Sequence, residues 1–253
     1  PLQLLGSLFD YVLEKRGQRV TIVGATSGDT GSAAIEAVRH CKNVDIFIMH
    51  PENRTSEVQR RQMTSVIAPN VFNIAVKGDF DDCQNAVKAM FKDEKFRDEM
   101  RLSAVNSINF VRIAAQIAYY FNTGIALGAP EQKASYVVPT GNFGNVYAAY
   151  SAKQMGLPVD KLIIGSNPND ILTRFFQTAS MTKVDVEPSL SPSMDIIVSS
   201  NFERYLFDLV GRDGAAVKRF MDSFTEKGVY TVDEKLMEKA RAEFSAHSCS
   251  DDE

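Results

Sequence analysis

One stretch of the chain, residues 140–145, combines glycines with small polar side chains between a short apolar run and a helical pattern. Residues 136–138 are typical of a buried strand, and residues 146–155 of a helix. At such a turn the free backbone N–H groups and the positive end of the helix favour an anion. The stretch holds no lysine or aspartate, so we expect a cofactor phosphate rather than a metal-bound triphosphate. The alternative is a tight turn that only needs positive φ.

A second stretch, residues 25–31, follows the same logic. Thr26, Ser27 and Thr30 offer hydroxyls beside unpaired N–H groups, which suits a carboxylate. Asp29 should then face a donor such as a phenolic hydroxyl. The alternative is that Asp29 or Ser27 caps the next helix. Because ligands bind at the carboxyl ends of strands in open α/β sheets, two such loops favour a ligand site.

A third strand-to-helix passage supplies donors of another kind. Amide, hydroxyl and guanidinium groups come from Asn106, Ser107, Asn109 and Arg112. Arginine with amides is a reasonable grip for a phosphate. The alternative is capping plus a surface salt bridge.

The pattern of apolar residues indicates strands alternating with helices. Strands are expected at residues 20–23, 45–49, 72–76, 102–105, 136–138 and 161–165, and helices at 4–14, 33–39, 56–64, 82–90, 108–121, 146–155, 169–177, 202–210, 215–225 and 233–244. This alternation predicts right-handed βαβ units and mainly parallel sheets. Residues 178–194 are expected to form a long loop. Asp79, Asp81 and Asp82 would suit a divalent metal, but helix capping is the simpler role, and we predict no metal site.

The composition limits the class of protein. The chain has 253 residues, 44% apolar and 24% charged, with net charge −4. This globular composition gives no footprint for nucleic acid or membrane, and no apolar run reaches the length of a membrane span. The three cysteines lack a Cys-x-x-Cys pair, which indicates free thiols in a reducing compartment and a cytoplasmic location by default.

Taken together, the motifs resemble those of the threonine synthase family, including its vertebrate threonine synthase-like members. They are residues 25–31, Asn106-Ser-Ile-Asn109 with Arg112, Gly141-Asn-Phe-Gly-Asn145, Ser191-Pro-Ser-Met-Asp195 and Asn201-Phe-Glu-Arg204. The resemblance implies an α/β fold of the pyridoxal-phosphate fold type II (tryptophan synthase β-like), with two open, mainly parallel twisted sheets flanked by helices. Residues 1–105 would form the smaller N-terminal domain, and residues 106–253 part of the larger, incomplete domain.

The resemblance also implies roles for single residues. The phosphate of pyridoxal 5′-phosphate would be held by Gly141, Asn142, Phe143, Gly144 and Asn145. The substrate carboxylate would bind Thr26, Ser27 and Thr30, with Asp29 near the cofactor's 3-hydroxyl. Asn106, Ser107, Asn109 and Arg112 would lie near the substrate phosphate. The implied chemistry is a carbon–oxygen lyase reaction on phosphorylated hydroxy amino acids, O-phosphohomoserine and phosphothreonine, rather than threonine manufacture.

One departure from the family pattern bears on activity. The Schiff-base lysine of the family lies in a Phe-Lys-Asp segment just before the helix that opens here at Pro1, and it is absent, as is the family's C-terminal part. We therefore expect a fragment or truncated isoform that is catalytically inactive as it stands and holds no cofactor covalently. The alternative is a non-catalytic secreted or signalling (cytokine-like) isoform that binds a protein partner through exposed apolar faces.

Overall fold

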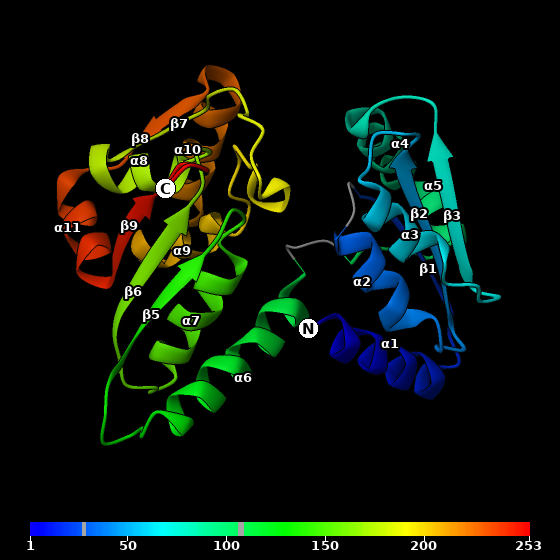
Figure 1. The fold of residues 1–253 in the computed structure, drawn as a ribbon, viewed down its shortest axis with the longest axis horizontal. Coiled ribbons are helices and arrows are strands. Elements are labelled where there is room, and N and C mark those ends of the chain that lie inside the picture. Colours follow the sequence, from blue (N-terminus) through cyan, green and yellow to red (C-terminus); the bar gives the residue numbers. More distant parts are fainter. Residues whose placement is uncertain (27–28, 106–108) are drawn as a thin grey trace. The chain divides into compact units, whose positions relative to one another are not determined.

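The chain forms two compact units, Pro1–Arg112 and Ile113–Glu253, and each is described by itself (Figure 1). The structure is a computed structural model that describes residues 1–26, 29–105 and 109–253. The boundary between the units lies a few residues beyond the position near 105 that the sequence suggested.

The first unit is built on a four-stranded parallel sheet with the order β3-β2-β1-β4. The strands are β1 (Val20–Ala25), β2 (Val44–Pro51), β3 (Val71–Val76) and β4 (Leu102–Ser103). The helices are α1 (Leu2–Arg16), α2 (Asp29–Val38), α3 (Glu57–Thr64), α4 (Phe80–Lys92) and α5 (Glu94–Glu99). Helices connect successive parallel strands, as a βαβ arrangement requires.

Both faces of this sheet are covered, because neighbouring strand residues point to opposite sides. Ile22 and Ile46 pack with buried residues of α1, α2 and α3. Val23 of β1 and Met49 of β2 point to the other face, where they pack with Cys83 of α4. The apolar runs of β1 and β2 therefore place the strands between two layers of helices.

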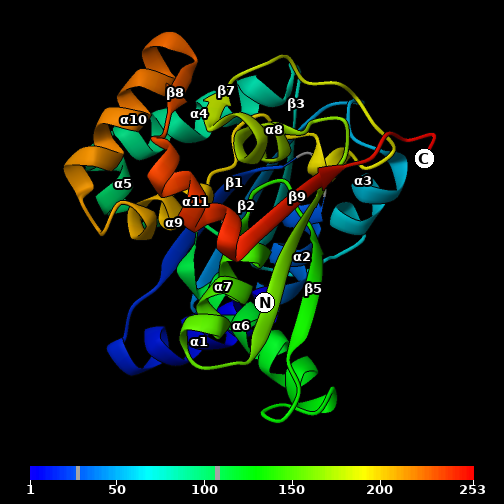
Figure 2. The same cartoon turned by 90° about the vertical axis from the view of Figure 1, so that its left-hand side faces the viewer.

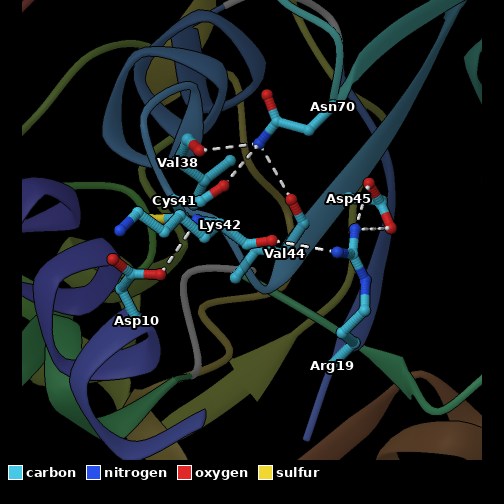
Figure 3. A network of polar contacts seen from close by, with 8 residues as sticks. All are labelled: Asp10, Arg19, Val38, Cys41, Lys42, Val44, Asp45 and Asn70. Atoms are coloured by element: carbon cyan, nitrogen blue, oxygen red, sulfur yellow. Dashed lines mark hydrogen bonds and ion pairs between the residues drawn. The ribbon is translucent and has the colours of Figure 1, made fainter. Parts of the chain in front are cut away.

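A polar network ties together the end of the sheet at which β2 begins (Figure 3). The Asn70 amide Nδ2 donates to the carbonyl oxygens of Val38 and Val44, at 2.9 and 2.8 Å. Arg19 makes a bidentate pair with Asp45, at 3.0 and 2.8 Å. Structural contacts therefore occupy this end of the sheet. The loops that carry the predicted site residues leave the opposite, carboxyl end.

The second unit has a three-stranded parallel sheet with the order β5-β6-β9 and a separate antiparallel pair, β7-β8 (Figure 2). The strands are β5 (Ala134–Pro139), β6 (Val159–Ser166), β7 (Ser180–Thr182), β8 (Val229–Thr231) and β9 (Phe244–Ser248). The helices are α6 (Phe110–Ala126, which starts in the first unit), α7 (Gly144–Gln154), α8 (Ile171–Thr178), α9 (Phe202–Leu209), α10 (Gly214–Lys227) and α11 (Glu234–Glu243), with a 3-10 turn at Pro192–Met194. Its core is rich in aromatic rings, with Phe143, Phe175, Phe202 and Phe244 almost fully buried.

The predicted fold class is confirmed: both main sheets are parallel and flanked by helices. The capping role expected of Asp79 is confirmed, because Asp79 forms a capping box with Asp82. Ser56 caps α3 and accepts from the N–H of Gln59. None of the helices in the described ranges is long and apolar enough to cross a membrane.

Some short elements were missed or placed wrongly. The predicted loop 178–194 contains β7, and α5, β8 and β9 were not predicted. The last predicted helix ran to Phe244, but α11 ends at Glu243 and Phe244 begins β9 opposite Leu162. These strands are short and take their stability from pairing with partners far away in the sequence, which local patterns do not show.

Candidate functional site

The loop between β5 and α7 is closed by a buried threonine. The N–H of Thr140 donates to the Gly165 carbonyl of the neighbouring strand at 2.9 Å. Its hydroxyl accepts from the N–H of Phe143 at 3.0 Å and donates to Asn145 Oδ1 at 2.7 Å. Asn145 Nδ2 in turn donates to the Pro139 carbonyl at 2.8 Å. The side chains of Thr140 and Asn145 therefore shape the loop rather than reach for a ligand.

Phe143 anchors the loop in the core. Its backbone is left-handed, with φ of 62°, which costs energy for a residue other than glycine. The side chain is fully buried, and its ring lies 5.1 Å from the Phe202 ring and 5.7 Å from the Phe244 ring. Burial of a phenylalanine contributes about 2 kcal/mol or more, which offsets the cost of the turn.

The same loop leaves several backbone donors without a partner. Among the described residues, no acceptor is found for the N–H groups of Gly141, Asn142, Gly144 and Asn145. The last two begin α7, where the helix dipole is positive. Neutral donors at a helix start fit a phosphate, and hence the phosphate of the cofactor that the sequence pointed to.

Three residues that sequence reasoning did not single out hold this loop from outside. The Tyr120 hydroxyl of α6 donates to the Asn145 carbonyl at 2.9 Å, and burial raises the pKa of Tyr120 to about 12. Ile196 and Ser199 contact Gly141. The last two lie between the motifs at 191–195 and 201–204, so the motifs were the available signal; nothing in the sequence pointed to Tyr120.

The motif 191–195 ends in an aspartate that organises its surroundings. Asp195 Oδ1 accepts from Asn167 at 2.7 Å, Asn169 at 3.0 Å and the Ser189 hydroxyl at 2.6 Å. Its second oxygen accepts from the N–H of Ser189 at 3.0 Å. Because Asn167 and Asn169 directly follow β6, this cluster fixes residues 189–195 to the carboxyl end of the sheet.

In the first unit, the loop after β1 starts with the same device. The N–H of Thr26 donates to the Met49 carbonyl at 3.0 Å, and the Thr26 hydroxyl accepts from the N–H of Gly31 at 3.1 Å. Asp29 is exposed, begins α2 and accepts from Gln59 at 2.9 Å, while Thr30 is half-buried. Ser27 lies outside the described residues.

The passage into α6 contains a half-buried arginine, Arg112, whose positive charge is paired with no carboxylate among the described residues. The side-chain Oδ1 of Asn109 accepts from the N–H of Val111 at 3.0 Å, so this amide oxygen caps the start of the helix. Arg112 is half-buried and donates to the Val105 carbonyl at 3.2 Å, but its Nε has no partner and no carboxylate lies within ion-pair distance among the residues described. Burial lowers the pKa of Arg112. Asn106 and Ser107 lie outside the described residues.

Within each unit the predicted site residues share one edge. The Thr26 loop follows β1 and the Arg112 passage follows β4, and these neighbouring strands are parallel, so both segments leave the same end of the sheet. Gly141 to Asn145 follow β5 in the second unit. That the loops of the two units serve one ligand stays a prediction. Among the described residues, no group of three or more His, Cys, Asp or Glu side chains could hold a metal.

Comparison with known proteins identifies relatives along the whole chain. A model of the family described as pyridoxal-phosphate dependent enzyme matches residues 4–245. The threonine synthase of Pseudomonas aeruginosa is 58% identical over 252 residues, which cover 100% of this chain and 54% of that protein. Threonine synthase-like 2 of Xenopus laevis is 38% identical and covers 94% of this chain and 51% of its own length.

The fold agrees with this relationship. The crystal structure of pyridoxal-phosphate-bound threonine synthase from Brucella melitensis superposes with a TM-score of 0.95 at 51% identity, covering 98% of this chain and 54% of that one. The chain therefore spans about half the length of the relatives it matches.

Proposed function

The chain belongs to the family of pyridoxal-phosphate dependent enzymes, and we propose that it carries the cofactor-phosphate site and the substrate-binding loops of a threonine synthase-like enzyme. The observation that carries this proposal is the loop 141–145, in which four backbone N–H groups lack acceptors among the described residues. Its shape is fixed by Phe143 and Thr140, so the donors need no ordering when a phosphate binds.

Pyridoxal phosphate, when bound, withdraws electrons from the substrate carbon. The part of this chain is binding and orientation. The N–H groups of Gly141, Asn142, Gly144 and Asn145 would hold the phosphate, and Asp29 would lie near the cofactor's 3-hydroxyl. Because Asp29 also accepts from Gln59, its carboxylate is already oriented.

The substrate is proposed to be a phosphorylated hydroxy amino acid, O-phosphohomoserine or phosphothreonine. Its carboxylate would bind the hydroxyls of Thr26, Ser27 and Thr30. Its phosphate would bind Arg112 with Asn106, Ser107 and Asn109, and the half-buried guanidinium without a carboxylate partner among the described residues supports this. A cation at this position would stabilise the negative charge that develops on the phosphate as it leaves.

The outcome of the reaction separates two versions of the proposal. The family resemblance implied lyase chemistry rather than threonine formation, and threonine synthase-like 2 of Xenopus laevis is 38% identical. The higher identity to a bacterial threonine synthase supports threonine formation. Incubation of the enzyme that contains this chain with O-phosphohomoserine decides between them. Threonine as the product supports the second version, and a keto acid supports the first.

The phosphate site can be tested on the chain itself. We expect pyridoxine 5′-phosphate to bind more tightly than pyridoxine in isothermal titration, because only the first carries the phosphate. Both lack the aldehyde and so cannot react with surface lysines. Equal affinity for the two ligands would overturn the assignment of the loop.

We further propose that this chain alone is catalytically inactive, because no lysine in it takes the place of the family's cofactor-linked lysine. Lys15 lies at the end of α1, and Lys77 directly follows β3. Treatment with pyridoxal phosphate and borohydride should label no single lysine stoichiometrically. One lysine labelled to completion, and protected by pyridoxine 5′-phosphate, contradicts inactivity.

One surface feature favours the second candidate function, a secreted or signalling product that binds a protein partner. Leu4, Leu8 and Tyr11 are 47%, 41% and 63% exposed at positions that share one face of α1. Intact-mass measurement of the native protein in cells and medium tests this alternative. Detection of only a longer, cell-retained chain removes it.

A further inference from the structure

A strap that comprises residues 195–202 crosses the phosphate loop from outside. Two of its contacts are hydrogen bonds to the backbone of the loop: the Ser199 hydroxyl donates to the Gly141 carbonyl at 2.7 Å, and the N–H of Asn201 donates to the Asn142 carbonyl at 3.1 Å. The third is a packing contact, because a Cβ added at Gly141 would lie 2.9 Å from Ile196 Cδ1. The strap therefore lies directly against the two peptides that open the loop.

These contacts fix the direction of an N–H group. In a trans peptide the carbonyl and the N–H point to opposite sides. Since the Gly141 carbonyl points at Ser199, the N–H of Asn142 points away from the strap. The next peptide is already satisfied at both ends, because Asn142 accepts from Asn201 and Phe143 donates to Thr140. Ser199 thus sets the orientation of the peptide that carries the N–H of Asn142, one of the loop donors without an acceptor among the described residues.

Ser199 itself has little freedom to move. It is only 9% exposed, and its carbonyl accepts from the N–H of Phe202 at 3.0 Å. The strap is held at its start by the bonds to Asp195 and at its end by Phe202, whose ring lies 4.9 Å from the Phe175 ring. A hydroxyl held in this way can hold a peptide in turn.

We propose that Ser199 is a positioning residue for phosphate binding. It does not contact the ligand, but its hydrogen bond to the Gly141 carbonyl directs the N–H of Asn142 toward the bound phosphate. This rests on the proposed function of the loop. Without the hydroxyl, the 141–142 peptide can rotate, and a rotated peptide would present its carbonyl oxygen to the anion.

The test compares Ser199→Ala, Ser199→Thr and Ser200→Ala in titrations with pyridoxine 5′-phosphate and pyridoxine. Ser199→Ala should weaken phosphate-ligand binding about 3- to 10-fold, the effect of one hydrogen bond, and leave pyridoxine binding unchanged. Ser199→Thr keeps the hydroxyl and should restore the preference. Ser200 is the exposed neighbour, and Ser200→Ala should behave as the wild type.

The outcomes separate this inference from the function it rests on. A wild-type chain that does not prefer the phosphorylated ligand overturns the function of the loop. A wild-type preference that Ser199→Ala retains in full overturns the role of Ser199 alone. A loss of affinity for both ligands would show a general structural effect and would likewise overturn it.

A second measurement needs no variant. When inorganic phosphate is added to the wild-type chain, the amide resonance of Asn142 should shift in a two-dimensional NMR spectrum, whereas that of Phe143, already bonded to Thr140, should shift little. The reverse pattern contradicts the proposed direction of the Asn142 N–H.

Discussion

The loops after β1 and β5 begin alike and are completed differently. In both, a threonine that is 5% exposed donates its N–H to the neighbouring strand and accepts with its hydroxyl from the N–H of a residue farther along the turn. In the first loop the neighbours of the glycine are local or come from α3: Gly31 faces Thr26 and Met63. In the second they come from the distant strap, with Ile196 against Gly141.

The ligand-binding groups differ in the same way. The second loop offers neutral backbone donors around a buried phenylalanine, whereas the first unit adds hydroxyls and the Arg112 cation at the same sheet edge. A preformed neutral site suits a resident cofactor phosphate, and a charged site suits a substrate phosphate that must bind and leave. Under the proposed function, one local pattern of strand, glycine and helix serves two kinds of anion, and the residues that pack around it set which one.

The largest effect is expected from Phe143→Ala. Truncation of this fully buried ring should lower the free energy of unfolding of the second unit by about 3–5 kcal/mol. Urea unfolding, followed by hydrogen exchange of amides in each unit, measures it. Phe207→Ala in α9 is the control, because that ring is 38% exposed and should cost far less. Equal costs would contradict the role of Phe143 as the anchor.

The two glycines should differ in their tolerance of a methyl group. In Gly31→Ala the new Cβ overlaps Thr26 Cγ2, part of a stiff branched side chain, and should cost about 1–3 kcal/mol. In Gly141→Ala the nearest atom is the movable end of Ile196, so the cost should be smaller. Thr26→Ser removes Cγ2, so the double variant with Gly31→Ala should regain most of the unfolding free energy that Gly31→Ala alone loses.

The control for both glycines is Gly214→Ala, where no heavy atom lies within 4 Å of the added Cβ. It should be close to neutral in the same unfolding measurement. A failure of Thr26→Ser to relieve Gly31→Ala would show that the local contact does not limit this position.

The threonines provide a third contrast. Thr140→Val leaves the buried N–H of Phe143 without an acceptor and removes the hydroxyl that donates to Asn145, which should cost about 2 kcal/mol. Thr26→Val removes the acceptor of the Gly31 N–H and should cost about 1 kcal/mol. Unfolding free energies of the two variants, compared unit by unit, would contradict this account if the order were reversed.

The smallest effect on stability concerns Arg112. Replacement of a half-buried guanidinium without a carboxylate partner among the described residues by methionine should change the unfolding free energy by less than about 1 kcal/mol. Stabilisation by O-phosphohomoserine, read as a shift in melting temperature, should be lost. The exposed Arg16→Met is the control and should keep that shift.

The sequence predicted the fold class and most helices and strands because the apolar patterns of the parallel strands are strong and local. It also predicted the cap at Asp79, which depends only on residues three apart in the sequence. The strands β8 and β9 were missed because their pairing partners lie far away, at β7 and β6.

The positions of the two candidate loops between a strand and a helix were also predictable from the sequence. Glycines and hydroxyls at strand ends pointed to the two loops, and Thr140 with Asn145 lies within one of them. The contacts from Ser199 and Tyr120 were not predictable, since they join segments 58 and 25 residues apart. Likewise, a pattern of residue types does not reveal that Asn109 and Asn145 use their amides on the backbone.

The most direct test of the central claim is a crystal structure of this chain with pyridoxine 5′-phosphate. We predict the phosphate within hydrogen-bond distance of the N–H groups of Gly141, Asn142, Gly144 and Asn145, with the Gly141 carbonyl still bonded to Ser199. A phosphate bound elsewhere, or an Asn142 N–H that faces the strap, would contradict the account.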